Sequence, residues 1–181
     1  MNKEQIDLLI KRFVFEQQKY RFNEPELVKR NNDLCFCKAF FGKEQVDESC
    51  IKQLLIDSIL NKNETELDLL LMLVEHFNVV KSCNVIIAEL LIQPWHHLHD
   101  RIAGILEFCP SEDIIEHLYK GALYYCDNLE YESDYCGFNR KCLYALSKIK
   151  TKEAICYLKE IATKSTTIVA AYAKDILAKI D

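Results

Sequence analysis

The chain has 181 residues, half of them apolar, which suits one domain that buries roughly 70% of its unfolded surface. This composition excludes a disordered protein, and only four Gly and three Pro argue against a β-rich fold with many tight turns. The apolar runs are far shorter than the ~20 residues that span a bilayer, so no membrane association is expected. The amino terminus has no signal-peptide profile, and nine cysteines, an odd count, favour buried thiols in a reduced, cytoplasmic protein over a secreted disulfide scaffold.

Charge is distributed unevenly along the chain. Residues 1–62 carry 11 basic and 10 acidic side chains, residues 63–136 carry 3 basic and 14 acidic, and residues 137–181 carry 9 basic and 4 acidic. A nucleic-acid-binding protein needs basic side chains that displace counterions, so the acidic middle argues against that class. The same acidic stretch attracts a basic protein partner and raises its association rate.

In chain order, the first elements are predicted to be three amphipathic helices. They cover about Asn2–Tyr20, a stretch from Asn23-Glu24-Pro25 to Phe41-Gly42, and about Val46–Leu60. The second of these helices is expected to carry Leu27, Leu34 and Phe36 on its apolar face. We therefore predict a single domain over 1–181, in which residues 1–62 form divergent amino-terminal helices and residues 63–181 form helical repeats.

A helical hairpin then occurs twice. Arg101–Leu118 aligns without a gap with Lys141–Leu158, forty residues later, and Ser111 and Thr151 coincide as hydroxyl N-caps. The aligned apolar pairs follow the spacing of a helix face: Ile102/Cys142, Ile105/Ala145, Leu106/Leu146, Cys109/Ile149, Ile114/Ala154, Ile115/Ile155, Leu118/Leu158 and Ala122/Ala162. This period predicts an all-α solenoid of antiparallel HEAT-like hairpins, an α-α superhelix of about nine to ten helices.

Less regular helices flank these two hairpins. Glu64–Phe77 and Cys83–Ile92 are predicted to form an earlier hairpin, which Pro94 closes. After Thr167 one more first helix is expected, with its apolar face formed by Ala173, Ile176, Leu177 and Ile180. The chain is thus expected to end on an incomplete unit, as capped solenoids do.

The stretch Tyr124–Phe138 interrupts the repeat and is the first candidate site; residues 127–135 of it are called the acidic tyrosine loop. Its candidate partner-binding residues are Asp127, Glu130, Tyr131, Glu132, Asp134 and Tyr135. Tyrosine offers rigid contact area and carboxylates pair with Lys or Arg, so this composition favours binding of a basic protein. The alternative is a solvated loop whose rings pack back onto the neighbouring repeat.

The second candidate is Trp95-His96-His97-Leu98-His99-Asp100, at the start of a predicted helix over Trp95–Cys109. On a helix, His96, His99 and Asp100 share one face, a spacing that holds zinc or iron if a further ligand arrives from elsewhere. The favoured alternative is a structural helix start, with Trp95 packed and the imidazoles hydrogen-bonded, because no second His-rich segment is present. No metal and no cofactor are therefore predicted.

Nothing in the sequence indicates catalysis. Cys35-Phe-Cys37 has one residue between its thiols, which is not the spacing of a redox CxxC motif. The chain has no Gly-rich phosphate loop and no nucleophile elbow. We predict that it is not an enzyme.

Three segments carry a resemblance to known proteins: Trp95–Ala103, Leu129-Glu-Tyr-Glu132 and Lys141–Ala154. They resemble HEAT-like repeat proteins, and together they look like a bacterial group of toxin-neutralising immunity proteins. The resemblance covers about residues 64–180 and implies a cytoplasmic protein that binds and blocks a cognate toxin. Another HEAT-repeat group, resembling deoxyhypusine hydroxylase, holds two irons with His-Glu pairs; here only His99-Asp100 is comparable, and the next repeat has Asn139.

The predicted function is that of a non-enzymatic module that binds a basic protein partner, with a nuclease-like toxin as the partner that the resemblance implies. The binding surface is predicted to combine the acidic tyrosine loop, Trp95–Asp100, Glu112 and Glu116. Two alternatives stay open: a generic HEAT-repeat scaffold, and a metal-dependent enzyme that uses His96, His99 and Asp100.

Overall fold

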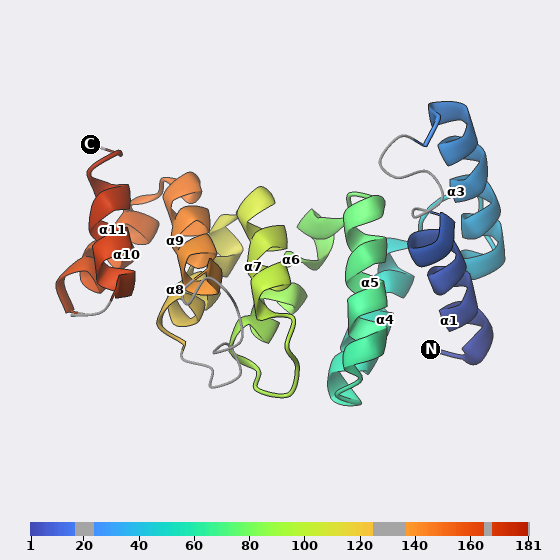
Figure 1. Ribbon diagram of the computed structural model, residues 1–181, viewed down its shortest axis with the longest axis horizontal. Coiled ribbons are helices and arrows are strands. Elements are labelled where there is room, and N and C mark those ends of the chain that lie inside the picture. Colours follow the sequence, from blue (N-terminus) through green and yellow to red (C-terminus); the bar gives the residue numbers. More distant parts are fainter. Residues whose placement is uncertain (17–23, 125–136, 165–167, 181) are drawn as a thin grey trace. The chain divides into compact units, whose positions relative to one another are not determined.

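The computed structural model describes residues 1–16, 24–124, 137–164 and 168–180, and within these ranges every regular element is a helix (Figure 1). Ten α-helices are joined by short π-helical and 3-10 segments, and these ranges contain no strand. The predicted all-α class is confirmed. None of these helices is both long and apolar enough to cross a membrane.

The chain divides into two compact units, Met1–Val79 and Val80–Asp181. The division separates the two helices that the sequence analysis pairs as an early hairpin, over Glu64–Phe77 and Cys83–Ile92. It therefore falls inside the stretch predicted to form repeats, 63–181, and not at its start.

The first unit consists of α1 (Lys3–Leu9), the π-helical η1 (Ile10–Glu16), α3 (Glu26–Phe41), α4 (Glu48–Leu60) and α5 (Glu64–His76). Side-chain caps fix several of these boundaries, since the side chains of Asn2, Asp47 and Asn63 accept backbone N–H groups at the starts of α1, α4 and α5. Gly42 ends α3 with a φ of 67°, a left-handed conformation that glycine adopts without strain.

The core of the first unit lies around α5, which packs against α4, α1 and η1. Five of its apolar side chains have no exposed surface: Leu67, Leu70, Leu71, Leu73 and Val74. A second cluster of aromatic rings joins η1, α3 and the end of α5. In it the Phe36 ring lies 5.4 Å from Phe13 and 5.9 Å from Phe77, measured between centroids.

The first predicted helix is helical as far as the structure describes it: α1 continues directly into the π-helical η1, and residues 17–20 lie outside the described residues. One expectation for the first unit is wrong. On α3 Phe36 is buried, but Leu27 and Leu34 are 71% and 37% exposed. α3 packs through a face that carries aromatic and polar side chains, so its leucine spacing did not identify the buried side.

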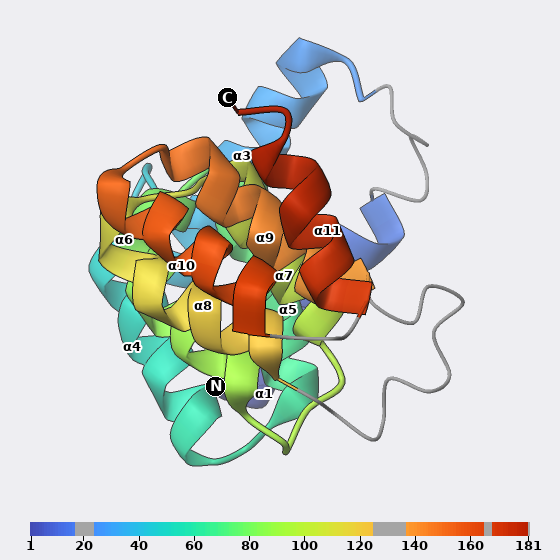
Figure 2. The ribbon, with the colours of Figure 1, turned by 90° about the vertical axis from the view of Figure 1, so that its left-hand side faces the viewer.

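The second unit consists of α6 (Val80–Ala88), η2 (Glu89–Ile92), α7 (His99–Phe108), η3 (Glu112–Ile114), α8 (Ile115–Leu123), α9 (Gly137–Ile149), α10 (Lys152–Lys164) and α11 (Ile168–Leu177). Figures 1 and 2 show α7, α9 and α11 on one side of this unit and α6, α8 and α10 on the other. α9 packs against α7, α8, α10 and α11, so it joins the two layers.

The apolar register predicted for the second unit is largely confirmed. Leu106 and Leu146 are fully buried, and so are Leu118 and Leu158. Of the N-caps, Thr151 accepts the backbone N–H of Ala154, as predicted. The Ser111 hydroxyl does not cap a helix and instead accepts the side-chain amide N–H of Asn84 at 2.6 Å, so that prediction is wrong.

The seven cysteines among the described residues are free thiols. Cys37, Cys83 and Cys142 are buried, and burial raises the pKa of Cys142 far above its usual value. Cys35 and Cys156 are exposed.

Candidate functional site

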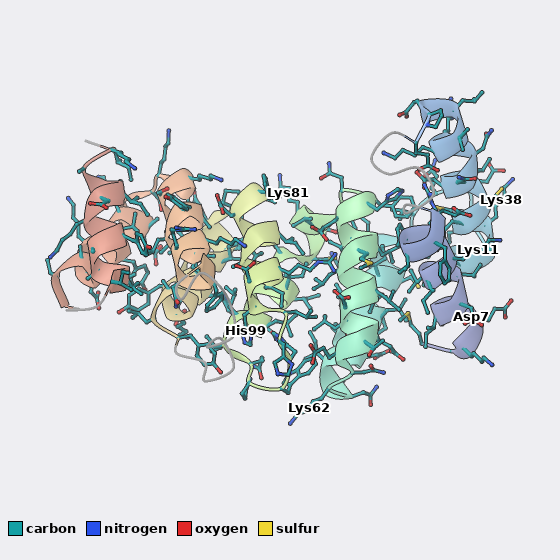
Figure 3. All side chains as sticks on the ribbon, viewed as in Figure 1. Asp7, Lys11, Lys38, Lys62, Lys81 and His99 are labelled. Atoms are coloured by element: carbon teal, nitrogen blue, oxygen red, sulfur yellow. The ribbon has the colours of Figure 1, made fainter. Side chains whose placement is uncertain are left out.

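The candidate residues of the second unit fall at two opposite ends of its helices. The lower end, where His99 lies in Figure 3, contains the Trp95–Asp100 segment and the end of α8. The upper end contains the turns that join α7 to α8 and α9 to α10, and Lys81 lies there in Figure 3. α7 has 10 residues, so the two ends are about 15 Å apart along its axis.

Two of the three histidines of the lower end, His96 and His99, are hydrogen-bonding residues inside the fold. His96 is fully buried and His99 is 1% exposed, with ring centroids 4.4 Å apart. The Nε2 atom of His96 lies 3.1 Å from the carbonyl oxygen of Leu90, and its Nδ1 accepts the backbone N–H of Leu98. Because a carbonyl only accepts, His96 is the neutral tautomer that carries its proton on Nε2.

His99 has the same role as His96. Its Nε2 lies 2.9 Å from the carbonyl oxygen of Gln93, the residue that ends η2, so Nε2 is the donor. Its ring stacks on Tyr124 at 5.7 Å and meets Phe138 edge-on at 5.6 Å. Both imidazoles are therefore hydrogen-bonded inside the fold, as the structural alternative for this segment predicted.

The helix predicted over Trp95–Cys109 begins four residues late, at His99. Trp95 and His96 therefore precede the helix, and the predicted shared face of His96, His99 and Asp100 is not formed. Carbonyl groups at the end of η2 draw the imidazoles inward, whereas the Asp100 carboxylate pairs with Lys141 at 2.5 Å. Across the described ranges no group of three or more His, Cys, Asp or Glu side chains is placed to hold a metal ion.

Asn139, the residue aligned with His99 forty positions later, acts in the same way at the start of α9. Its side-chain amide lies 3.2, 3.1 and 3.0 Å from the carbonyl oxygens of Gly121, Ala122 and Tyr124. These carbonyls belong to the last turn of α8, which has no further intrahelical donors. His99 and Asn139 therefore each donate to carbonyl groups at the end of the preceding helical segment.

The acidic residues of the middle segment are partly neutralised by lysines of the carboxy-terminal segment. Asp100 pairs with Lys141, and Glu107 pairs with Lys148 at 2.8 Å. Within α8, Lys120 donates to Glu116 at 2.8 Å and lowers the pKa of that carboxyl. Part of the charge asymmetry that suggested an external partner therefore forms ion pairs between neighbouring helices.

Glu112 lies at the upper end, beyond the far end of α7 from Asp100, and Glu116 follows one turn later in α8. Glu112 and its neighbour Asp113 are exposed and have no ion-pair partner among the described residues. The structure therefore does not bring Glu112 next to Asp100. The loop residues of the predicted surface lie outside the described residues: Asp127, Glu130, Tyr131, Glu132, Asp134 and Tyr135.

Sequence reasoning missed Phe108, the last residue of α7, whose side chain is 90% exposed. The alignment at forty residues matches Phe108 to Lys148, a surface position, and this was the signal that could have identified it. The Lys148 ammonium nitrogen lies 5.7 Å from the centre of the Phe108 ring.

Sequence reasoning also missed a buried ion cluster in the first unit, centred on Arg12, which is 3% exposed. Its guanidinium donates to Asp33 from Nε at 3.0 Å and from a terminal nitrogen at 2.6 Å. It also donates twice to Glu24, at 3.2 and 3.1 Å, and once to Glu16, at 3.3 Å. The Nε2 atom of His76 lies 2.7 Å from the same Asp33 oxygen.

The Arg12 cluster fixes the charge state of its carboxylates. Burial opposes ionisation of Asp33, but hydrogen bonds from His76 and Arg12 outweigh it and lower the pKa of Asp33. Burial also opposes the charge on Arg12, and its bonds to Glu24 and Asp33 outweigh this effect and raise its pKa. A shallow pocket of about 290 Å³ adjoins the cluster, but carboxylates already accept from all five N–H groups of Arg12. The cluster is therefore structural, because the N–H groups of Arg12 are already used within the fold and none remains to bind a ligand.

No family model, no curated protein and no solved structure matches this chain.

Proposed function

We propose that this chain is a non-enzymatic, HEAT-like helical-repeat module that binds a basic protein partner through the lower end of its second unit. The observation that carries the proposal is a set of three contacts, Asp100–Lys141, Glu107–Lys148 and Tyr119–Glu160, each between residues 41 positions apart. Contacts that recur at one sequence separation are expected of hairpins stacked with a constant register.

The buried polar residues give further support for stacked repeats. His99 and Asn139 occupy aligned positions and both donate to carbonyls at the end of the preceding helix. The aligned leucines of both helices in each hairpin are buried in the same way. Repeat proteins of this kind present extended surfaces, and their inter-repeat insertions collect on one face.

The distribution of carboxylates favours the lower end as the binding surface. Asp100, Glu107 and Glu116 already pair with lysines of the same unit, so their charge is less available to a partner. The acidic tyrosine loop has four carboxylates between residues 127 and 134 and no basic residue. The described residues that precede and follow it, Tyr124 and Gly137, belong to the end of α8 and the start of α9 at the lower end. A basic protein is the partner that this composition attracts. A toxin of that charge, which the resemblance implies, is one such partner.

The test compares two variants that change the net charge equally. The loop variant carries Asp127→Asn, Glu130→Gln, Glu132→Gln and Asp134→Asn. The control variant carries Glu4→Gln, Asp7→Asn, Glu153→Gln and Asp175→Asn, four exposed positions outside the loop. Wild type and both variants are used to capture proteins from the native cytoplasm, and the captured protein is then purified and titrated directly.

The expected result is one basic protein that binds wild type and the control variant and loses at least about tenfold in affinity for the loop variant. An equal loss of affinity in both variants would show that the protein is attracted by net charge alone. That result would contradict the lower end as the binding surface. If the purified protein is a toxin, its activity is expected to fall in step with occupancy by wild type. Absence of any specific capture would contradict the binding function itself.

A further inference from the structure

The upper end of the second unit combines an exposed aromatic ring with two patches of opposite charge. Phe108 has the most exposed of the large apolar side chains described in the structure. Burial of this ring against another surface is favourable, because water leaves its apolar area on association. Among the described residues, the lower end does not combine an exposed aromatic ring with two such patches, so the feature is separate from the proposed partner site.

The two charged patches lie on neighbouring turns. The turn between α7 and α8 is followed by the exposed carboxylates of Glu112 and Asp113. The turn between α9 and α10 carries the exposed lysines Lys150 and Lys152, with the carboxylate of Glu153 after them. Within the described ranges, neither the carboxylates of the acidic turn nor the two lysines have an ion-pair partner.

The turns are neighbours in space because Lys148 bridges them. Its ammonium group donates to the Glu107 carboxylate at 2.8 Å and to the Glu107 carbonyl oxygen at 3.2 Å, and it also lies near the Phe108 ring. Phe108 therefore stands at the border between an acidic turn and a basic turn. We call the surface formed by Phe108, Glu112, Asp113, Lys150 and Lys152 the tip surface.

We propose that the tip surface binds a second copy of this chain in a twofold symmetric dimer. A twofold axis beside Phe108 places the acidic turn of one copy on the basic turn of the other, and the reverse, so both contacts form at once. The two Phe108 rings then bury each other near the axis. Charge pairs at the rim contribute mainly to orientation and rate, and the aromatic contact contributes most of the affinity.

The first experiment is sedimentation equilibrium of the full chain up to about 1 mM, a range that reveals even a weak dimer. Wild type is expected to show a monomer–dimer equilibrium. Phe108→Ala is expected to raise the dissociation constant at least about tenfold. Leu123→Ala, which truncates an exposed side chain at the other end of α8, is the matched control and is expected to leave it unchanged.

The second experiment exchanges the charges. Glu112→Lys with Asp113→Lys makes the whole tip basic, and Lys150→Glu with Lys152→Glu makes it acidic. Neither variant is expected to form a dimer with itself, whereas an equimolar mixture is expected to form a heterodimer that added salt weakens. Far-UV circular dichroism verifies that each variant keeps its helices.

Three results would overturn the proposal. One is a wild type that stays monomeric over the whole concentration range. Another is a dimer that survives Phe108→Ala unchanged, which would move the interface elsewhere. The third is a charge-exchanged mixture that gives no heterodimer although both variants are folded. The dimer does not depend on the partner at the lower end, so neither proposal fails with the other.

Discussion

Asp100 and Lys141 lie 41 residues apart in the sequence and form a 2.5 Å ion pair between α7 and α9. Lys141 also donates to the backbone carbonyl of Asp100 at 3.3 Å. The pair joins the acidic middle of the chain to its basic carboxy-terminal segment. The uneven charge along the sequence therefore helps to hold α9 against α7.

The first prediction concerns this pair. Asp100→Lys and Lys141→Asp are each expected to lower the free energy of unfolding, and the double exchange is expected to recover most of the loss. Both side chains are about one third exposed, at 37% and 32%, so the coupling energy is expected to be about 0.2–1 kcal/mol. A double-mutant cycle measured by urea unfolding at low and high salt gives this coupling energy. A coupling energy that does not change with salt would contradict its assignment to an ion pair.

The second prediction concerns close packing at Gly121 in α8. A Cβ atom there would lie 3.1 Å from the Cys142 sulfur and 3.3 Å from Leu91 side-chain atoms. Gly121→Ala is therefore expected to destabilise the second unit by about 1–3 kcal/mol. Fluorescence of Trp95, the single tryptophan, follows unfolding of this unit.

Gly104→Ala is the matched control for Gly121→Ala. Its Cβ would meet only the Lys141 ammonium nitrogen, at 3.9 Å, which is ordinary contact. Because glycine weakens a helix interior, this change is expected to stabilise α7 by about 0.5–1 kcal/mol. Equal effects of the two substitutions would contradict the packing account.

The third prediction concerns Asn139, which donates to three carbonyls at the end of α8. Asn139→Ala is expected to cost about 1–3 kcal/mol, because these buried carbonyls lose their donor. Asn139→Asp is expected to cost more at neutral pH, since a carboxylate has the same shape and cannot donate. The folded protein then favours the protonated carboxyl, so the penalty should shrink as the pH falls toward 4, whereas the Ala variant shows no such recovery.

The fourth prediction concerns the acid sensitivity of the first unit. The pKa values of Asp33 and Glu24 are lowered in the folded chain, in each case because hydrogen bonds that include those from Arg12 outweigh burial. Their stabilising effect is complete above the ordinary carboxyl pKa of about 4 and is lost as the pH falls through the lowered values. Hydrogen exchange of α3 amides is therefore expected to accelerate steeply below about pH 4.

Two variants test the origin of that acid sensitivity. In the Asp33→Asn variant, the α3 amides are expected to exchange faster at neutral pH. Their exchange rate is also expected to depend less on pH, because one titrating group is gone. Arg12→Met is expected to be more destabilising and to lower the free energy of unfolding by about 3–5 kcal/mol in total, since it leaves partly buried carboxylates without their cation. An unchanged pH profile in Asp33→Asn would assign the acid sensitivity to other groups.

The helical class, the apolar register of the two hairpins and the leucines that fill their cores could be predicted from the sequence. This was possible because the buried face of a helix follows from the local spacing of apolar residues such as Leu106 and Leu118. The roles of His96, His99 and Arg12 became visible in the folded chain. Their partners lie on other elements, and periodicity within one helix contains no information about them.

The candidate site divides in the same way. Composition alone singled out the acidic tyrosine loop, which lies outside the described residues. By contrast, the packing of α9 against α7 determines the ion pairs of Asp100 and Glu107 and the exposure of Phe108. A side chain's ion-pair partner and its exposed fraction depend on the neighbouring helices, which local sequence spacing does not specify.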